Sequence, residues 1–173
     1  MLALIGVALA LHPTDAGRRD WFVAGLVLSM LGDVFLMLPR DAFIAGLASF
    51  LLAHIAYIVG LRLHGGSASS WATSAVAVLA VDVVLARPVL VAVRRRHPEL
   101  VVPVVAYVVV ISTMVAAALA TGVALAIVGA VLFFASDTLI AWNRFVRPRP
   151  WMPLAIIVTY HAGQAGLVLS LAR

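Results

Sequence analysis

Long apolar runs separated by short polar or proline-containing breaks dominate the pattern of hydrophobic and polar positions along this chain. A helix needs about 20 residues to cross the hydrocarbon core of a bilayer, and these runs have that length. They predict membrane-spanning helices over residues 20–38, 42–62, 69–86, 99–120, 122–142 and 150–171. The apolar segment 1–11 is too short to cross alone and is interpreted as the end of a helix.

This pattern predicts an all-α fold: a polytopic integral-membrane helix bundle with six full transmembrane helices and a partial N-terminal one. We expect residues 1–173 to form a single domain. The predicted connections contain proline, glycine or charged residues, which end helices. They are His12-Pro13, Pro39-Arg40-Asp41, His64 to Ser67, Arg87-Pro88 through His97-Pro98, and Arg147 to Pro150. Thr121-Gly122 is predicted to form the tightest turn.

The composition agrees with a membrane protein, since 65% of the 173 residues are hydrophobic and only 11% are charged. Soluble domains carry about 25% charged residues. The absence of cysteine excludes disulfides, thiolate metal sites and a cysteine nucleophile. The five histidines lack the spacing of metal ligands. We therefore expect neither a metal nor a cofactor, and the oligomeric state is left open.

The positive charge comes entirely from arginines in the predicted loops, which favours contact with lipid headgroups over binding of nucleic acid. One side of the membrane would hold Arg40, Arg87, Arg94, Arg95, Arg96, Arg144, Arg147 and Arg149. The other would hold Arg18, Arg19, Arg62 and Arg173. By the positive-inside rule the first side is cytoplasmic. We expect a multi-pass protein of the bacterial inner (plasma) membrane.

Two carboxylates interrupt runs that otherwise suit lipid: Asp33 and Asp137. An acidic side chain in hydrocarbon costs at least a few kcal/mol, so such residues face a bundle interior and mark functional sites. Both lie about five residues before a cytoplasmic loop, or roughly 7–9 Å below it at 1.5 Å per residue. Asp82 differs, because it lies near the expected break at Arg87. We expect it to snorkel toward the interface or to pair with that arginine.

Other polar side chains enter the same half of the membrane at helical spacing. Gly25, Ser29 and Asp33 follow one another at intervals of four residues and form a small-residue face suited to helix packing. Further polar residues lie on predicted packing stripes or on the same side of the membrane: His54, Tyr57, Tyr107, Ser136, Tyr160 and Gln164. We interpret His161 as structural. The convergence suggests acid–base chemistry around two buried carboxylates.

Three blocks of sequence resemble a known family. They are Gly32-Asp33-Val-Phe-Leu-Met-Leu-Pro39 with Phe50-Leu-Leu-Ala-His54-Ile-Ala-Tyr57, then Gly129 to Asp137, then Tyr160-His-Ala-Gly-Gln164. These blocks are similar to those of the YhhN-like membrane proteins, which include the lysoplasmalogenases. The resemblance runs from about residue 20 to the C-terminus. Family members have eight helices and a Lys-Pro pair before the second, so we expect this chain to begin after the family's first helix.

The resemblance implies hydrolysis of the vinyl ether bond of lysoplasmalogens, which releases a fatty aldehyde and a glycerophospho head group. Vinyl ethers cleave by protonation of the alkene carbon, so the enzyme needs a neutral acid and a nearby negative charge. Burial among apolar side chains favours the protonated form of a carboxyl group, and a second carboxylate favours it further. We predict Asp33 and Asp137 as the catalytic pair, with interchangeable roles. The predicted supporting or substrate-binding residues are His54, Tyr57, Tyr107, Ser136, Tyr160 and Gln164.

Three alternatives have different sequence requirements. An intramembrane aspartyl protease needs a G-x-G-D motif, whereas Met30 and Leu31 precede Gly32-Asp33 here. A small proton-coupled transporter usually has inverted repeats and midplane titratable groups, and neither pattern is clear. A non-catalytic lipid-binding protein stays open. For the hydrolase, the expected partners are the lipid bilayer and a membrane lipid substrate, with no nucleic acid.

Overall fold

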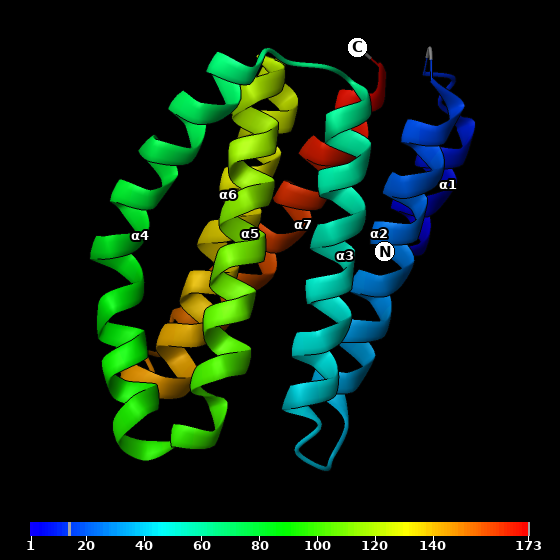
Figure 1. The fold of residues 1–173 in the computed structure, drawn as a ribbon. Helices are drawn as coiled ribbons and strands as arrows, with labels where there is room; N and C mark the ends of the chain where they lie inside the picture. Colours follow the sequence, from blue (N-terminus) through cyan, green and yellow to red (C-terminus); the bar gives the residue numbers. More distant parts are fainter. Residues whose placement is uncertain (14, 173) are drawn as a thin grey trace.

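The computed structural model describes residues 1–13 and 15–172, and the regular structure of these residues is entirely helical. The α-helices are α1 (Leu2–Ala10), α2 (Ala16–Met37), α3 (Phe43–Leu63), α4 (Ala68–Arg96), α5 (Val101–Thr121), α6 (Ala124–Ala141) and α7 (Met152–Leu169) (Figure 1). A π-helical turn, Trp142–Val146, continues α6. Within this described part, six helical segments are long and apolar enough to cross a membrane. The chain is a multi-pass integral-membrane helix bundle, as predicted.

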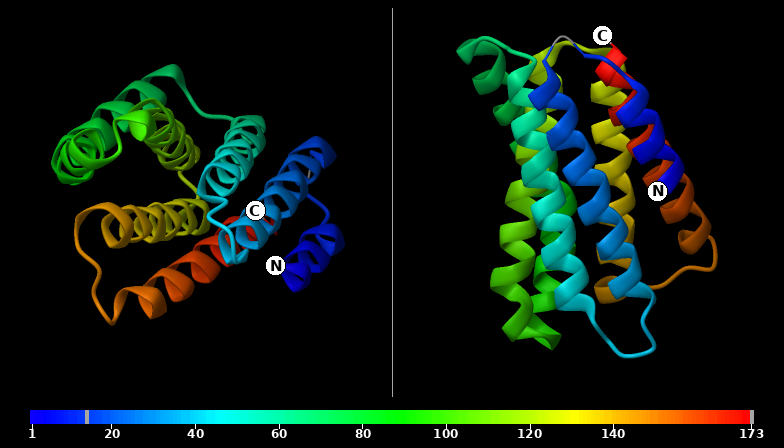
Figure 2. Two further views of the ribbon diagram at one scale, coloured as in Figure 1. Left: turned by 90° about the horizontal axis from the view of Figure 1, so that it is seen from below. Right: turned by 90° about the vertical axis from the view of Figure 1, so that its right-hand side faces the viewer.

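The bundle is built from three antiparallel hairpins, with α2 against α3, α4 against α5 and α6 against α7 (Figure 1). Seen end-on, the hairpins surround a common centre, and α3 and α5 bring two of them together (Figure 2). The short helix α1 packs outside, against α2 and α7. Aromatic side chains fill the centre, including the fully buried Tyr57 and Phe133. A second apolar cluster, around Phe43, Val93 and Phe145, lies where α3, α4 and the π-helical turn meet.

The helix ends agree with the prediction to within a few residues at most breaks. Gly122 has φ +68°, a left-handed conformation that glycine adopts without strain, and it ends α5 at the predicted turn. Residues 2–10 form only a short helix, in agreement with the partial N-terminal one that was expected.

The fourth helix is the exception, because it does not end at Arg87-Pro88 but continues to Arg96. A proline inside a helix costs about 3 kcal/mol or more. Beyond it, however, Val89 and Val93 follow at helical spacing and are buried against the cluster around Phe43 and Phe145. Burying each valine contributes roughly 1.5–3 kcal/mol. This packing sustains the helix through Pro88, so the predicted loop from 87 to 98 was wrong over most of its length.

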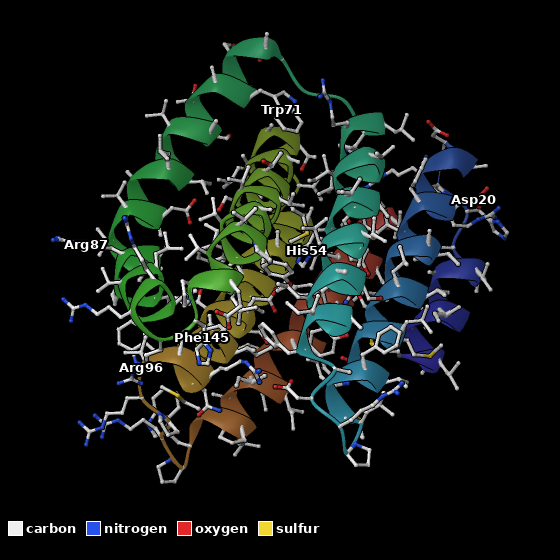
Figure 3. All side chains as sticks on the ribbon, turned by 60° about the horizontal axis from the view of Figure 1, so that its bottom comes forward. Asp20, His54, Trp71, Arg87, Arg96 and Phe145 are labelled. Carbon is white, nitrogen blue, oxygen red and sulfur yellow. The ribbon has the colours of Figure 1, made fainter. Side chains whose placement is uncertain are left out.

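Most of the arginines expected on the cytoplasmic side lie at one end of the bundle. This arginine-rich end holds the loops after α2, α4 and the π-helical turn (Figure 1). Arg18, Arg19 and Arg62 belong to the opposite end, and Arg173 lies outside the described residues. Arg87 was wrongly assigned to a loop: it lies within α4 and is exposed on its outer side (Figure 3). Arg96 ends that helix at the arginine-rich end.

The hairpin of α6 and α7 depends on three glycines at its contact face, which are Gly129, Gly163 and Gly166. A Cβ atom at Gly163 would lie 2.7 Å from the backbone nitrogen of Phe133. One at Gly129 would lie 2.5 Å from the backbone nitrogen of Leu167. These distances are too short for any side chain, so the two backbones touch directly. Small residues permit this close approach in membrane helices, where van der Waals packing drives association.

We expect Gly163→Ala to destabilise the protein by roughly 1–3 kcal/mol, because the backbone of α6 must move to admit a methyl group. Unfolding by denaturant in detergent micelles measures this change. Gly6→Ala is the matched control, since nothing lies within 4 Å of a Cβ atom there. The control should be neutral or slightly stabilising. Equal effects of the two substitutions would contradict the direct backbone contact.

At the arginine-rich end, one ion pair joins the loop after α2 to the π-helical turn. Arg144 Nη2 donates to Asp41 Oδ2 at 2.8 Å, and the guanidinium lies 4.0 Å from the centre of the Phe43 ring. The backbone N–H of Phe43 also donates to Asp41. The bond from Arg144 is the main reason that the pKa of Asp41 lies below its usual value.

The stability that this pair contributes is present above the pKa of an unfolded aspartate, about 3.9. It is lost as the pH falls through the lower pKa of the folded state. We therefore expect Asp41→Asn to lower the melting temperature slightly at neutral pH and to have no effect in strong acid. Both groups are solvent-exposed, so the effect should also shrink in high salt. A pH-independent difference would contradict this assignment.

Candidate active site

Asp137 on α6 is the centre of a group of polar side chains inside the bundle. Tyr107 on α5 donates its hydroxyl hydrogen to Asp137 Oδ2. His54 Nε2, from α3, lies 3.7 Å from the same oxygen. His54 is completely buried and points into the bundle (Figure 3). Three helices therefore bring a carboxyl, a phenol and an imidazole to one point.

The hydrogen bonds of His54 determine which of its ring nitrogens carries hydrogen. Nδ1 lies 2.5 Å from the carbonyl oxygen of Phe50, one turn earlier in α3. A carbonyl can only accept, so Nδ1 must be the donor. In a neutral ring, Nε2 then presents a lone pair toward Asp137, and it has no hydrogen-bond partner. Two lone pairs would face each other unless a proton resides on one group. The geometry thus favours a proton held by the pair of Asp137 and His54.

Asp33, on α2, lies in a separate part of the same network. Tyr160 on α7 donates to Asp33 Oδ2 at 2.9 Å. The Phe133 ring packs against the partners of both carboxyl groups: its centroid lies 5.3 Å from that of Tyr160 and 4.7 Å from that of His54. Asp33 and Asp137 are near enough to interact electrostatically. The predicted convergence of the two aspartates is therefore present, but each has its own tyrosine.

Three other predicted residues connect helices. The Tyr57 hydroxyl donates to Gln164 Oε1, and Gln164 Nε2 donates to Ser29 Oγ at 3.0 Å, so this network joins α3, α7 and α2. Ser136 Oγ donates to the carbonyl of Ile156 on α7 at 3.1 Å. Tyr57, Gln164 and Ser29 are fully buried, and in an apolar bundle they can be satisfied only by one another. Their geometry is that of interhelical ties.

A largely apolar pocket of about 90 Å³ opens beside Asp137, between α3, α4, α5 and α6. Phe43, Phe50 and Phe145 are among its aromatic lining residues. Its polar lining comes from Asp82, Tyr107, Asp137 and Thr138. Asp33 does not line this pocket. An apolar wall with a few polar groups has the chemical character of a ligand-binding site.

Asp82 was not predicted as a site residue, and the interpretation given to it was wrong. Because α4 continues to Arg96, Asp82 lies in the middle of the helix and not near its end. It is half-buried and lines the pocket, whereas Arg87 is exposed. The available signal was an acidic residue in a long apolar run, which by itself indicates function. The assumed break at Pro88 concealed it.

The described residues contain no group of three His, Asp or Glu side chains that would hold a metal ion. The groups that this site presents are carboxyl, phenol and imidazole, in an apolar surrounding. A membrane-embedded helix bundle with such a site is an integral-membrane protein that holds a cluster of titratable side chains inside the bilayer.

Comparison with known proteins gives the family. The sequence matches the YhhN family over residues 1–171, so the chain belongs to that family, as its sequence blocks suggested. It is 32% identical over 173 residues to the human protein named lysoplasmalogenase TMEM86B, covering all of this chain and 72% of that one. It is 34% identical over 171 residues to a Mycobacterium tuberculosis protein named lysoplasmalogenase, covering 95% of this chain and 64% of the relative. No solved structure matches the chain significantly.

The tie formed by Tyr57 yields a test of stability. Tyr57→Phe removes the hydroxyl that satisfies Gln164 and leaves a buried amide oxygen without a donor. We expect a loss of about 1–3 kcal/mol in the free energy of unfolding. Thr113→Val is the control, because Thr113 is exposed and bonds only to its own helix in the contact described. That control should change stability by less than about 0.5 kcal/mol. An unchanged stability of the Tyr57 variant would contradict its role as a tie.

Proposed function

We propose that this protein hydrolyses the vinyl ether bond of lysoplasmalogen-type lysophospholipids, giving a fatty aldehyde and a glycerophospho head group. Support comes from its family and from relatives named lysoplasmalogenase. The observation that carries the proposal is the buried approach of His54 Nε2 to Asp137 Oδ2 at 3.7 Å, which favours a proton on this pair, next to an apolar pocket. Cleavage of a vinyl ether begins with the transfer of a proton to carbon, which requires an acid of this kind.

In the proposed reaction, the protonated carboxyl group of Asp137 donates to the alkene carbon that is remote from the ether oxygen. The carbon attached to oxygen becomes an oxocarbenium ion. Water adds to this carbon and loses a proton, giving a hemiacetal. Collapse of the hemiacetal breaks the carbon–oxygen bond to glycerol, whose oxygen takes up the proton lost by water. The hemiacetal hydroxyl returns a proton to Asp137 as the aldehyde forms. Protonation in a site shielded from water avoids competition from solvent.

Asp33 has the role of a fixed negative charge in this scheme. An ionised carboxylate nearby favours the neutral form of a second carboxyl, and it attracts a cation formed in the pocket through space without touching it. Its bond from Tyr160 is compatible with the ionised state, because a phenol donates to it. Tyr107 and His54 orient Asp137. Tyr57, Ser136 and Gln164 keep the helices at the required separation.

We further propose that the protein acts in the bacterial inner membrane, with its arginine-rich end toward the cytoplasm. A single-chain lipid would place its head group at this end and its alkenyl chain along the apolar pocket. Phe43 and Phe145, which line the pocket, also belong to the cluster packed near that end and so support this orientation.

The decisive experiment measures aldehyde release from a vinyl ether lysolipid and fatty acid release from the matching ester lysolipid. We expect the first reaction and not the second. Asp137→Asn should lower kcat by roughly 10²–10⁴-fold, the usual contribution of a general acid. Asp33→Asn should lower it less, because a charge is lost but the acid remains.

Asp20→Asn is the control, since Asp20 is exposed and pairs with its neighbour Arg19 (Figure 3). It should keep the activity of the original protein. Full activity of Asp137→Asn would refute the catalytic assignment. Binding of the lysolipid without release of aldehyde would instead identify a non-catalytic lipid-binding protein.

A further inference from the structure

Two buried polar atoms in the middle of the bundle lack the hydrogen bonds that burial normally requires. Asp82 Oδ1 on α4 and Ser112 Oγ on α5 are both buried without a hydrogen-bond partner. The two side chains lie near enough to interact with each other, but short of the geometry of a hydrogen bond. An unsatisfied buried polar group costs roughly 1–3 kcal/mol. A pair of them in a membrane bundle therefore indicates a bound molecule or a chemical role.

Asp82 and Asp137 enter one pocket at a similar depth in the bundle. Both side chains line the same pocket, Asp82 from α4 and Asp137 from α6. Val89 and Phe145 belong to one packed cluster and so lie at a similar depth along the axis of the bundle. Asp82 precedes Val89 by seven residues and Asp137 precedes Phe145 by eight, which is about 10–12 Å along each helix. The two carboxyl groups therefore enter the pocket at a similar depth from different helices.

The carboxyl groups of Asp137, Asp33 and Asp82 differ in the hydrogen bonds that they already accept. Asp137 accepts the Tyr107 hydroxyl and faces His54. Asp33 accepts a bond from Tyr160 and does not line the pocket. Asp82 thus has an oxygen available where the substrate would lie. A water molecule donating to Asp82 and bonding Ser112 would satisfy both orphaned atoms.

We propose that Asp82 and Ser112 hold the water that attacks the oxocarbenium ion, with Asp82 as the general base. This assignment rests on the proposed function. Asp137 first transfers its proton to the alkene carbon. Water bound at Asp82 then forms a bond to the carbon attached to oxygen, and Asp82 accepts the proton that this water loses. During collapse of the hemiacetal, Asp137 accepts the proton of the hemiacetal hydroxyl and Asp82 donates its proton to the departing glycerol oxygen, which restores both groups.

The experiment uses the full chain, a vinyl ether lysolipid and solvent D₂O. Without the base, protonation of the alkene still occurs but capture by water becomes slow, so the cation returns its proton before it reacts. We expect Asp82→Asn to lower kcat by roughly 10²-fold with little change in KM. Substrate recovered from this variant should carry deuterium on the alkene carbon, and substrate recovered from the original protein should not. Ser112→Ala should give a smaller change of the same kind.

If Asp82 served only to stabilise the fold, replacing it would lower the melting temperature. The proposal predicts the opposite. We expect Asp82→Leu to raise the melting temperature by a few degrees while it abolishes turnover, because it removes a buried unsatisfied carboxyl group. The exposed Asp20→Leu is the matched control and should change neither property. A lower melting temperature for Asp82→Leu would overturn the proposal. So would full activity of Asp82→Asn, or lost activity without deuterium in the recovered substrate. If the original protein itself releases no aldehyde, the proposed function fails and this assignment falls with it.

Discussion

The interior of a bilayer offers polar groups no water, so those in this bundle depend on partners within the protein, and the longest reach is between helices. The glycine contacts between α6 and α7 make this possible, because they bring the backbones close enough for short side chains to reach across. Ser136 then reaches a carbonyl of α7, and Tyr160 extends from α7 to Asp33 on α2. The polar network and the close packing are thus one arrangement. A wider separation of α6 and α7 would weaken both.

Neighbouring residues on one helix have separate tasks because an α-helix turns by about 100° per residue. Ser136 faces α7 and binds its backbone, whereas Asp137 faces the pocket and binds Tyr107. Similarly, α3 directs Tyr57 toward the tie with Gln164 and His54 toward Asp137. The rigid contacts that hold the bundle therefore lie within one turn of the groups assigned to chemistry. This proximity supplies the precise positioning on which acid–base chemistry depends.

Much of this organisation is predictable from the sequence, because apolar runs and helix-ending residues are local signals. Asp33 and Asp137 stand out for the same reason, as charges in such runs. The course of α4 beyond Pro88 is not local: it depends on the burial of Val89 and Val93 against residues of α3 and the π-helical turn. The pocket position of Asp82 follows from that course, and so sequence reasoning missed it. The separate tyrosines of the two aspartates also depend on helix rotation, which no spacing rule determines.

One consequence concerns His54, whose Nδ1 lies on the carbonyl of Phe50 within its own helix. The tautomer of this imidazole is therefore set by the main chain of α3 and needs no second side chain to select it. A mutation that preserves every polar residue but distorts this turn would release the ring and redistribute the proton near Asp137. Helical regularity is thereby coupled to protonation, and the integrity of a single backbone turn becomes a chemical property of the site.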